Sequence, residues 1–162
     1  VICTDKTGTL TQNRMSVEDA KFYGFQKDFA SEEGRRIQES IACNATAELD
    51  FEKPVPAGIG NPTEAALLLW LYSNGVDYRT VRRSVQFVQE LPFSTMRKCM
   101  ATTVQSADGK RRVYVKGAPE IVLGMCRQIA HGVRREEILA QLRAYQEQAM
   151  RTMGFACQEL DG

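Results

Sequence analysis

One segment limits the folds open to this chain more than any other, because it is a predicted β-hairpin. Two runs of β-favouring residues, 98–105 and 111–116, flank Asp108-Gly109, a strong turn signal. Further strands are expected at 85–91 and 154–160. The chain should therefore contain an antiparallel sheet.

The loop length of this hairpin decides which side chains share a face. A two-residue loop would make Met100 face away from Lys116, because successive side chains alternate along a strand. A three-residue loop, Ala107–Gly109, sets Met100 opposite Lys116 and gives Gly109 the left-handed conformation that such loops require. We predict the three-residue loop. It places four residues together on the core face, namely Ala101, Thr103, Val113 and Val115.

Helices are expected around these strands. Ser31 is a good N-cap, and Ile37, Ile41 and Ala45 then fall on one helical face. Asn61-Pro62-Thr63-Glu64 starts a second helix, which should stop near Gly75. The remaining expected elements are a strand at 15–25, a loop at 50–60, and helices at 77–83, from Pro119, and at 136–151. The mixture indicates an α+β fold in which helices flank an antiparallel β-sheet.

Composition excludes several classes of function. The chain has 162 residues and is 43% hydrophobic, which is enough for one core. Its net charge of +1 gives no general affinity for nucleic acid or for a membrane surface. The longest apolar run, Ala65–Tyr72, is far shorter than the ~20 residues that span a bilayer. With no visible signal peptide, the chain as given is expected to be soluble.

Cysteine and histidine usage argues against metal and disulfide chemistry. Five cysteines are scattered without a C-x-x-C pair, which suits buried thiols in a reducing compartment. His131 is the single histidine, so neither a histidine triad nor a histidine metal cluster can form from these residues. The sequon Asn44-Ala45-Thr46 is expected to be idle.

The opening stretch carries the clearest chemical signal. Asp5-Lys6-Thr7-Gly8-Thr9-Leu10-Thr11 follows an apolar run that suits a buried strand. An aspartate just past a strand end is where an α/β sheet presents chemistry, and an aspartate can attack a phosphoryl group. Lys6 can supply charge, and the Thr7 and Thr9 hydroxyls can donate hydrogen bonds. The alternative is an ordinary polar turn after a strand.

The DKTGTLT stretch resembles the phosphorylation motif of P-type ATPases, ion pumps that pass through an aspartyl phosphate. The resemblance implies that Asp5 is phosphorylated, with Lys6, Thr7 and Thr9 beside it. It also implies that Asp5 and Thr7 are ligands of Mg²⁺ in the intact pump. A phosphatase of the haloacid-dehalogenase group would usually carry a second aspartate where Thr7 stands.

The rest of the chain is similar to the nucleotide-binding domain that this family inserts after that motif. In ELPFSTMRKCM, the resemblance makes Phe93 the residue that stacks on adenine, with Lys98 and Met100 beside the nucleotide. In KGAPE, it makes Lys116, Gly117 and Ala118 the bottom of the pocket. Without the resemblance, Phe93 would be a core residue, and KGAPE would be a strand end followed by a helix start.

Two further segments complete the implied ATP site. In GNPTE, Thr63 and Glu64 match the residues beside adenine, although a capping box would also explain Glu64. Arg151 matches an arginine that reaches the phosphates, although it would otherwise be a solvated charge near a helix end. Thr95 stands where some calcium pumps carry an arginine, so either the affinity is lower or Arg97 substitutes.

These matches imply an ATP-binding domain fragment of a P-type cation-transporting ATPase, with calcium favoured as the ion. Its domains would be residues 1–14 (edge of the phosphorylation domain and hinge), 15–160 (nucleotide-binding domain) and 161–162 (start of the return hinge). It would be a cytoplasmic part of a membrane pump and would bind ATP without turnover by itself. Its other partners would be the phosphorylation, actuator and membrane domains. The alternatives are a soluble haloacid-dehalogenase-type phosphatase and a docking domain without nucleotide binding.

Overall fold

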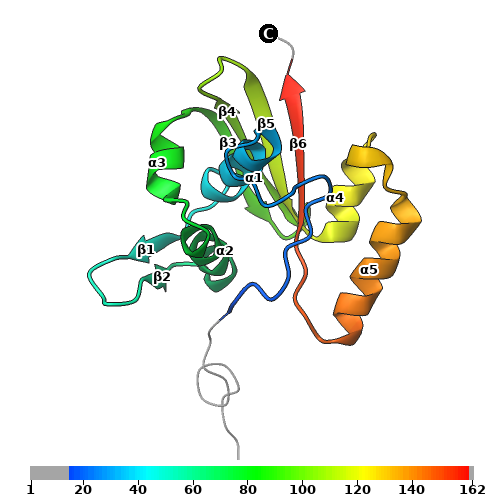
Figure 1. Ribbon diagram of the computed structural model, residues 1–162. Helices are drawn as coiled ribbons and strands as arrows, with labels where there is room; N and C mark the ends of the chain where they lie inside the picture. Colours follow the sequence, from blue (N-terminus) through cyan, green and yellow to red (C-terminus); the bar gives the residue numbers. More distant parts are fainter. Residues whose placement is uncertain (1–14, 161–162) are drawn as a thin grey trace, which may run out of the picture. The chain divides into compact units, whose positions relative to one another are not determined.

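The computed structural model describes residues 15–160 and contains helices and two antiparallel sheets within that range (Figure 1). The predicted α+β class is confirmed. The chain divides into two compact units. Within the described range, the first combines residues 15–20 with 45–77, and the second combines residues 21–44 with 78–160. Four predicted catalytic residues lie outside the described range, namely Asp5, Lys6, Thr7 and Thr9.

The first unit is a small hairpin packed against one helix. Strands β1 (Glu48–Asp50) and β2 (Ala57–Ile59) pair antiparallel, and both contact helix α2 (Pro62–Ser73). The Asn61 side chain caps α2 by accepting hydrogen bonds from two backbone N–H groups, as predicted. The expected loop at 50–60 was partly wrong, because β2 lies within it. A three-residue strand is too short to show an alternating pattern in the sequence.

The second unit contains a four-stranded sheet in the order β3-β4-β5-β6. Its strands are β3 (Gln86–Ser94), β4 (Cys99–Gln105), β5 (Arg111–Gly117) and β6 (Gly154–Leu160). Every neighbouring pair is antiparallel. Met100 pairs with Lys116, Ser106 N donates to Lys110 O, and Gly109 has φ +80°. The three-residue loop predicted for the hairpin is confirmed.

The helices of the second unit pack against this sheet and against one another. They are α1 (Glu32–Ala42), α3 (Tyr78–Arg83), α4 (Pro119–Met125) and α5 (Arg135–Glu147), with a 3₁₀ turn at Ala130–Gly132 between the last two. Figure 1 shows α1 against the sheet and α5 beside α4. Arg135 joins this second pair, because its guanidinium donates to the carbonyls of Leu123 and Cys126 at the end of α4.

The core of the second unit lies between α1 and the sheet face that carries Met100, Thr102, Val104 and Tyr114, all of which are buried. The predicted core face was therefore wrong. Ala101, Thr103, Val113 and Val115 lie on the opposite face and are only half-buried. This face can be buried although it carries polar side chains, because Glu39 on α1 satisfies two of them. Its Oε2 accepts hydrogen bonds at 2.6 Å from both Tyr114 Oη and Ser106 Oγ.

Asn44 follows α1 and is 0% exposed. Its Nδ2 donates to Met100 O at 3.4 Å and to Tyr114 O at 3.2 Å, and its Oδ1 accepts from Thr102 Oγ1 at 3.0 Å. The buried amide therefore joins β4 to β5 and is closed to glycosylation in the folded domain. Beside it, burial raises the pKa of the Cys43 thiol to about 12, with a smaller contribution from Glu39.

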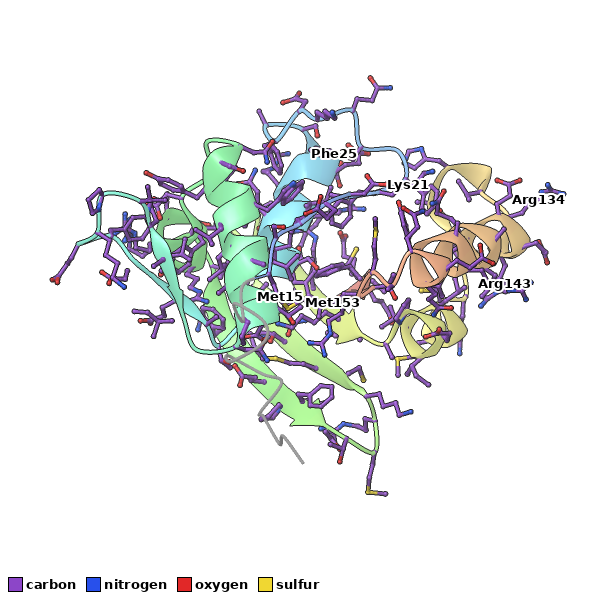
Figure 2. The ribbon with its side chains drawn as sticks, turned by 90° about the horizontal axis from the view of Figure 1, so that it is seen from below. Met15, Lys21, Phe25, Arg134, Arg143 and Met153 are labelled. Atoms are coloured by element: carbon purple, nitrogen blue, oxygen red, sulfur yellow. The ribbon has the colours of Figure 1, made fainter. Side chains whose placement is uncertain are left out.

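Other expectations also need correction. No strand forms at 15–25. Within the second unit, Phe22 packs against Phe155, with ring centroids 5.7 Å apart. Lys21, which is labelled in Figure 2, donates a hydrogen bond to Gln141 of α5. Helix α1 ends at Ala42, so Ala45 is not on its apolar face. Helix α5 ends at Glu147 rather than at residue 151, because Ala149 adopts φ +57° and reverses the chain. Cys157 is exposed, unlike the buried Cys43 and Cys99.

Candidate functional site

One end of the four-stranded sheet collects most of the predicted ATP-site residues. At this end β3 and β5 finish, and β4 and β6 begin, because the strands are antiparallel. The residues there are Phe93 near the end of β3, Lys98 and Met100 at the start of β4, Lys116 and Gly117 at the end of β5, Ala118 after it, and Arg151 shortly before β6. Topology thus brings together three sequence segments that are far apart along the chain.

Phe93 owes its position to a β-bulge. Leu91 pairs with Ala101 and Ser94 pairs with Cys99, so Pro92 and Phe93 together oppose Met100 alone. A proline fits this place because β3 is an edge strand and the bulge needs no ladder N–H from it. Phe93 is 60% exposed, which excludes the alternative that it is a core residue. The sheet end thus presents an accessible aromatic ring.

The turn between β3 and β4 is held by its own hydrogen bonds. Lys98 N donates to Ser94 O at 2.6 Å, and Ser94 Oγ accepts from the backbone N–H groups of Met96 and Arg97. The Arg97 guanidinium donates to Pro92 O at 2.8 Å and so ties the turn to the bulge. Arg97 therefore has a structural contact of its own besides the phosphate role considered for it.

The positive charges at this end differ in exposure. Lys98 and Arg151 are exposed, whereas Lys116 is 5% exposed and lies opposite Met100, which is 3% exposed. Met100 is further fixed because Asn44 donates to its carbonyl. An accessible aromatic ring with several cations nearby can bind a ligand that combines a flat ring with negative charge.

KGAPE is both a strand end and a helix start, as either interpretation required. Lys116 and Gly117 close β5, and Pro119 opens α4. Between them, Ala118 N donates to Lys98 O at 2.9 Å, and Ala118 O accepts from the N–H groups of Ile121 and Val122 in α4. The segment is therefore bonded directly to the turn that carries Lys98.

Thr63 and Glu64 belong to the first unit, and the structure describes their surroundings there. Glu64 is 7% exposed, and its Oε2 accepts from Thr46 N at 2.8 Å, Thr46 Oγ1 at 2.9 Å and Ala47 N at 3.0 Å. Thr63 Oγ1 donates to Met15 Sδ at 3.2 Å. Glu64 thus anchors the Thr46–Ala47 segment, a structural role that neither the capping-box interpretation nor the adenine interpretation anticipated.

Comparison with known proteins identifies the family of this chain. Residues 34–162 match the family model of the P-type ATPase cytoplasmic domain N. The chain belongs to this family. As an N domain, it matches over 96% of its length a calcium-transporting ATPase of Lactococcus lactis, at 31% identity. It matches over 99% of its length a probable cation-transporting P-type ATPase of Mycoplasma genitalium, at 36% identity.

A third relative of the N domain is calcium-transporting ATPase PAT1 of Dictyostelium discoideum, 35% identical over 96% of this chain. The chain spans only 19%, 16% and 15% of the lengths of these three relatives, in the order given. Within residues 15–160, no helix is long and apolar enough to span a membrane. In the same range, no three His, Cys, Asp or Glu side chains form a group that could hold a metal.

Sequence reasoning missed two residues that shape this end of the sheet. Asn44 donates a hydrogen bond to the Met100 carbonyl from a position far away in the sequence. In the sequence, Asn44 stood out only as part of a glycosylation sequon. Ser94 organises the turn through its hydroxyl. A Ser before a short polar loop is a known local turn signal, so Ser94 could have been found from the sequence.

Proposed function

We propose that this N domain binds ATP at the sheet end that carries Phe93 and that it serves a P-type cation pump, with calcium as the transported ion. The observation that carries the proposal is the exposed Phe93 ring at the same sheet end as Lys98, Lys116 and Arg151. The names of two relatives, calcium-transporting ATPases of L. lactis and D. discoideum, support calcium.

In this proposal adenine stacks on Phe93 and the phosphates meet the positive charges. Base stacking on an aromatic side chain contributes about 1–3 kcal/mol. Met100, Gly117 and Ala118 line the site, and Lys98, Lys116 and Arg151 neutralise the phosphates. Contact of Thr63 and Glu64 with adenine stays a prediction from the resemblance alone.

In the intact pump, the proposed phosphoryl transfer is carried out by the residues of the DKTGTLT motif. The Asp5 carboxylate attacks the γ-phosphorus, the bond to the β,γ-bridging oxygen breaks, and ADP leaves. Lys6, Thr7 and Thr9 stabilise the charge that develops on the transferred group. The oxygens of Asp5 and Thr7 are ligands that Mg²⁺ accepts, and the bound ion would neutralise phosphate charge.

The proposed domain bounds separate the phosphorylation motif from the part of the chain that binds ATP. Residues 1–14 form the edge of the phosphorylation domain with its hinge, 15–160 form the N domain, and 161–162 begin the return hinge. The N domain would be a cytoplasmic part of a membrane pump, and its partner would be the rest of that pump. By itself, the N domain would bind ATP without hydrolysing it.

A titration of the N domain with ATP and GTP, followed by calorimetry, tests this proposal. We expect saturable binding that favours ATP, and Phe93→Ala should weaken it about tenfold or more because the stacking platform is lost. Phe87→Ala is the matched control. Phe87 is 48% exposed on the same strand but pairs near its other end, opposite Val104. Equal losses in both variants, or no saturable binding by the folded wild type, would contradict the proposal.

A further inference from the structure

We propose that Gly117 is a positioning residue of the ATP site, which it serves by leaving room for the Lys98 carbonyl. Through that carbonyl it fixes the β3–β4 turn, defined as residues 94–99, and with it the Phe93 platform. The proposal rests on the proposed function. In this proposal Gly117 affects ATP binding through the β3–β4 turn, whereas in a direct role Gly117 would itself contact ATP.

The space around Gly117 supports this role. A Cβ on Gly117 would overlap the Lys98 carbonyl oxygen and would lie 2.7 Å from both Cα and Cβ of Cys99. Most of these atoms are backbone atoms, so they cannot move aside as a flexible side chain would. Gly117 does not have a positive φ, so its backbone conformation is open to other residues. Close approach of β4 is therefore what requires glycine here.

The Lys98 carbonyl, for which Gly117 leaves room, is held in place by a hydrogen bond. Ala118 N donates to Lys98 O at 2.9 Å, and Lys98 N donates to Ser94 O at 2.6 Å. Lys98 itself has φ +54°, a left-handed conformation that is strained for a residue with a side chain. Such strain persists only where the neighbouring structure holds it, and these two hydrogen bonds are the holding contacts.

The β3–β4 turn also contacts the bulge that contains Phe93. Arg97 belongs to the turn, and its guanidinium donates to Pro92 O within the bulge. Pro92 and Phe93 share that bulge opposite Met100. A continuous set of contacts therefore runs from Gly117 through the Lys98 backbone and the Arg97 side chain to the aromatic platform. Moving the Lys98 carbonyl should displace both the platform and the Lys98 ammonium group.

A double-mutant cycle between Gly117→Ala and Phe93→Ala tests the role, with dissociation constants for ATP measured by NMR titration. We expect Gly117→Ala alone to weaken ATP binding about tenfold, and to weaken it less than about threefold when Phe93 is already alanine. The cost should shrink because the displaced platform is then absent. Equal costs in the two backgrounds would overturn the proposal.

Two glycines provide matched controls, with folding followed by circular dichroism. Gly154 pairs with Gly117 on β6, but its added Cβ would crowd Pro119 and Val122 of α4 rather than the turn. Gly124 would meet nothing within 4 Å. Gly154→Ala should cost less affinity than Gly117→Ala, and Gly124→Ala should change it less than about twofold. A loss in Gly154→Ala as large as that in Gly117→Ala would overturn the role of the turn.

Ala118→Pro reaches the same contact without touching Gly117. It removes the N–H that bonds to Lys98 O, at a φ of −54° that proline tolerates. We expect the same loss of ATP affinity, again reduced in the Phe93→Ala background. If the wild type binds ATP and both Gly117→Ala and Ala118→Pro bind it equally well, this inference fails while the proposed function stands. If the wild type does not bind ATP, the proposed function itself fails.

Discussion

A carboxylate that is only 7% exposed needs partners, and Glu64 finds them in the backbone and hydroxyl of Thr46 and in the N–H of Ala47. Glu64→Ala would leave these donors without their acceptor. We expect the free energy of unfolding to fall by about 1–3 kcal/mol, measured by urea denaturation. Glu52→Ala is the control, because Glu52 is exposed in the same unit. Its effect should stay within about 0.5 kcal/mol.

The same pair of variants separates structure from ligand contact at this residue. If Glu64 serves only adenine, Glu64→Ala would keep the stability of the wild type and lose affinity for ATP. Unchanged stability would therefore contradict the anchoring role described above. Loss of both stability and affinity would show that one carboxylate serves both purposes.

At the scale of elements, the end of α5 carries a strained residue. Ala149 has φ +57°, and Met150 N donates back to Tyr145 O, which is the pattern of a helix that ends in a left-handed residue. Glycine adopts this conformation without the cost that a Cβ imposes. Ala149→Gly should therefore raise the free energy of unfolding by about 1 kcal/mol.

Ala140→Gly is the opposite control for this prediction. Ala140 is exposed within α5, where glycine should lower the free energy of unfolding by about 1 kcal/mol. Thermal unfolding of both variants gives the comparison directly. Two shifts of the same sign would contradict the left-handed ending of α5.

Elements were predictable where the signal was local. The register of the β4–β5 hairpin followed from a short loop and one glycine, and the start of α2 followed from Asn61 and Pro62. The buried face of the same hairpin was not predictable. Thr102 and Tyr114 are buried because Asn44 and Glu39 satisfy their hydroxyls, and those partners come from a distant segment.

The expected strand at 15–25 failed for a related reason. β-Favouring residues mark segments that fit a half-buried surface, and pairing requires a sheet edge as well. Here the aromatic residues serve packing instead. Within the second unit, Phe22 contacts Phe155 and Phe25 contacts Phe29 at 4.9 Å. The sequence shows the apolar character of such residues but not the surface that receives them.

At the scale of the whole molecule, the candidate site depends on chain topology. The motifs around Phe93 and Lys116 could be recognised in the sequence by resemblance. Their meeting at one sheet end follows from the antiparallel order β3-β4-β5-β6. Without that resemblance the exposure of Phe93 could not be predicted, because a lone aromatic residue in a strand is more often buried. The bulge that presents it depends on pairing with β4.

The most direct test of the proposed ATP site is an NMR titration of the N domain with ATP that maps which backbone amides shift. We expect saturable shifts concentrated at 93–98, 100, 116–118 and 151, at one end of the sheet. Little change is expected at the hairpin tip, residues 107–110, at the other end of β4 and β5. Shifts concentrated at that tip, or no saturable shifts from a folded domain, would contradict the assignment of the ATP site.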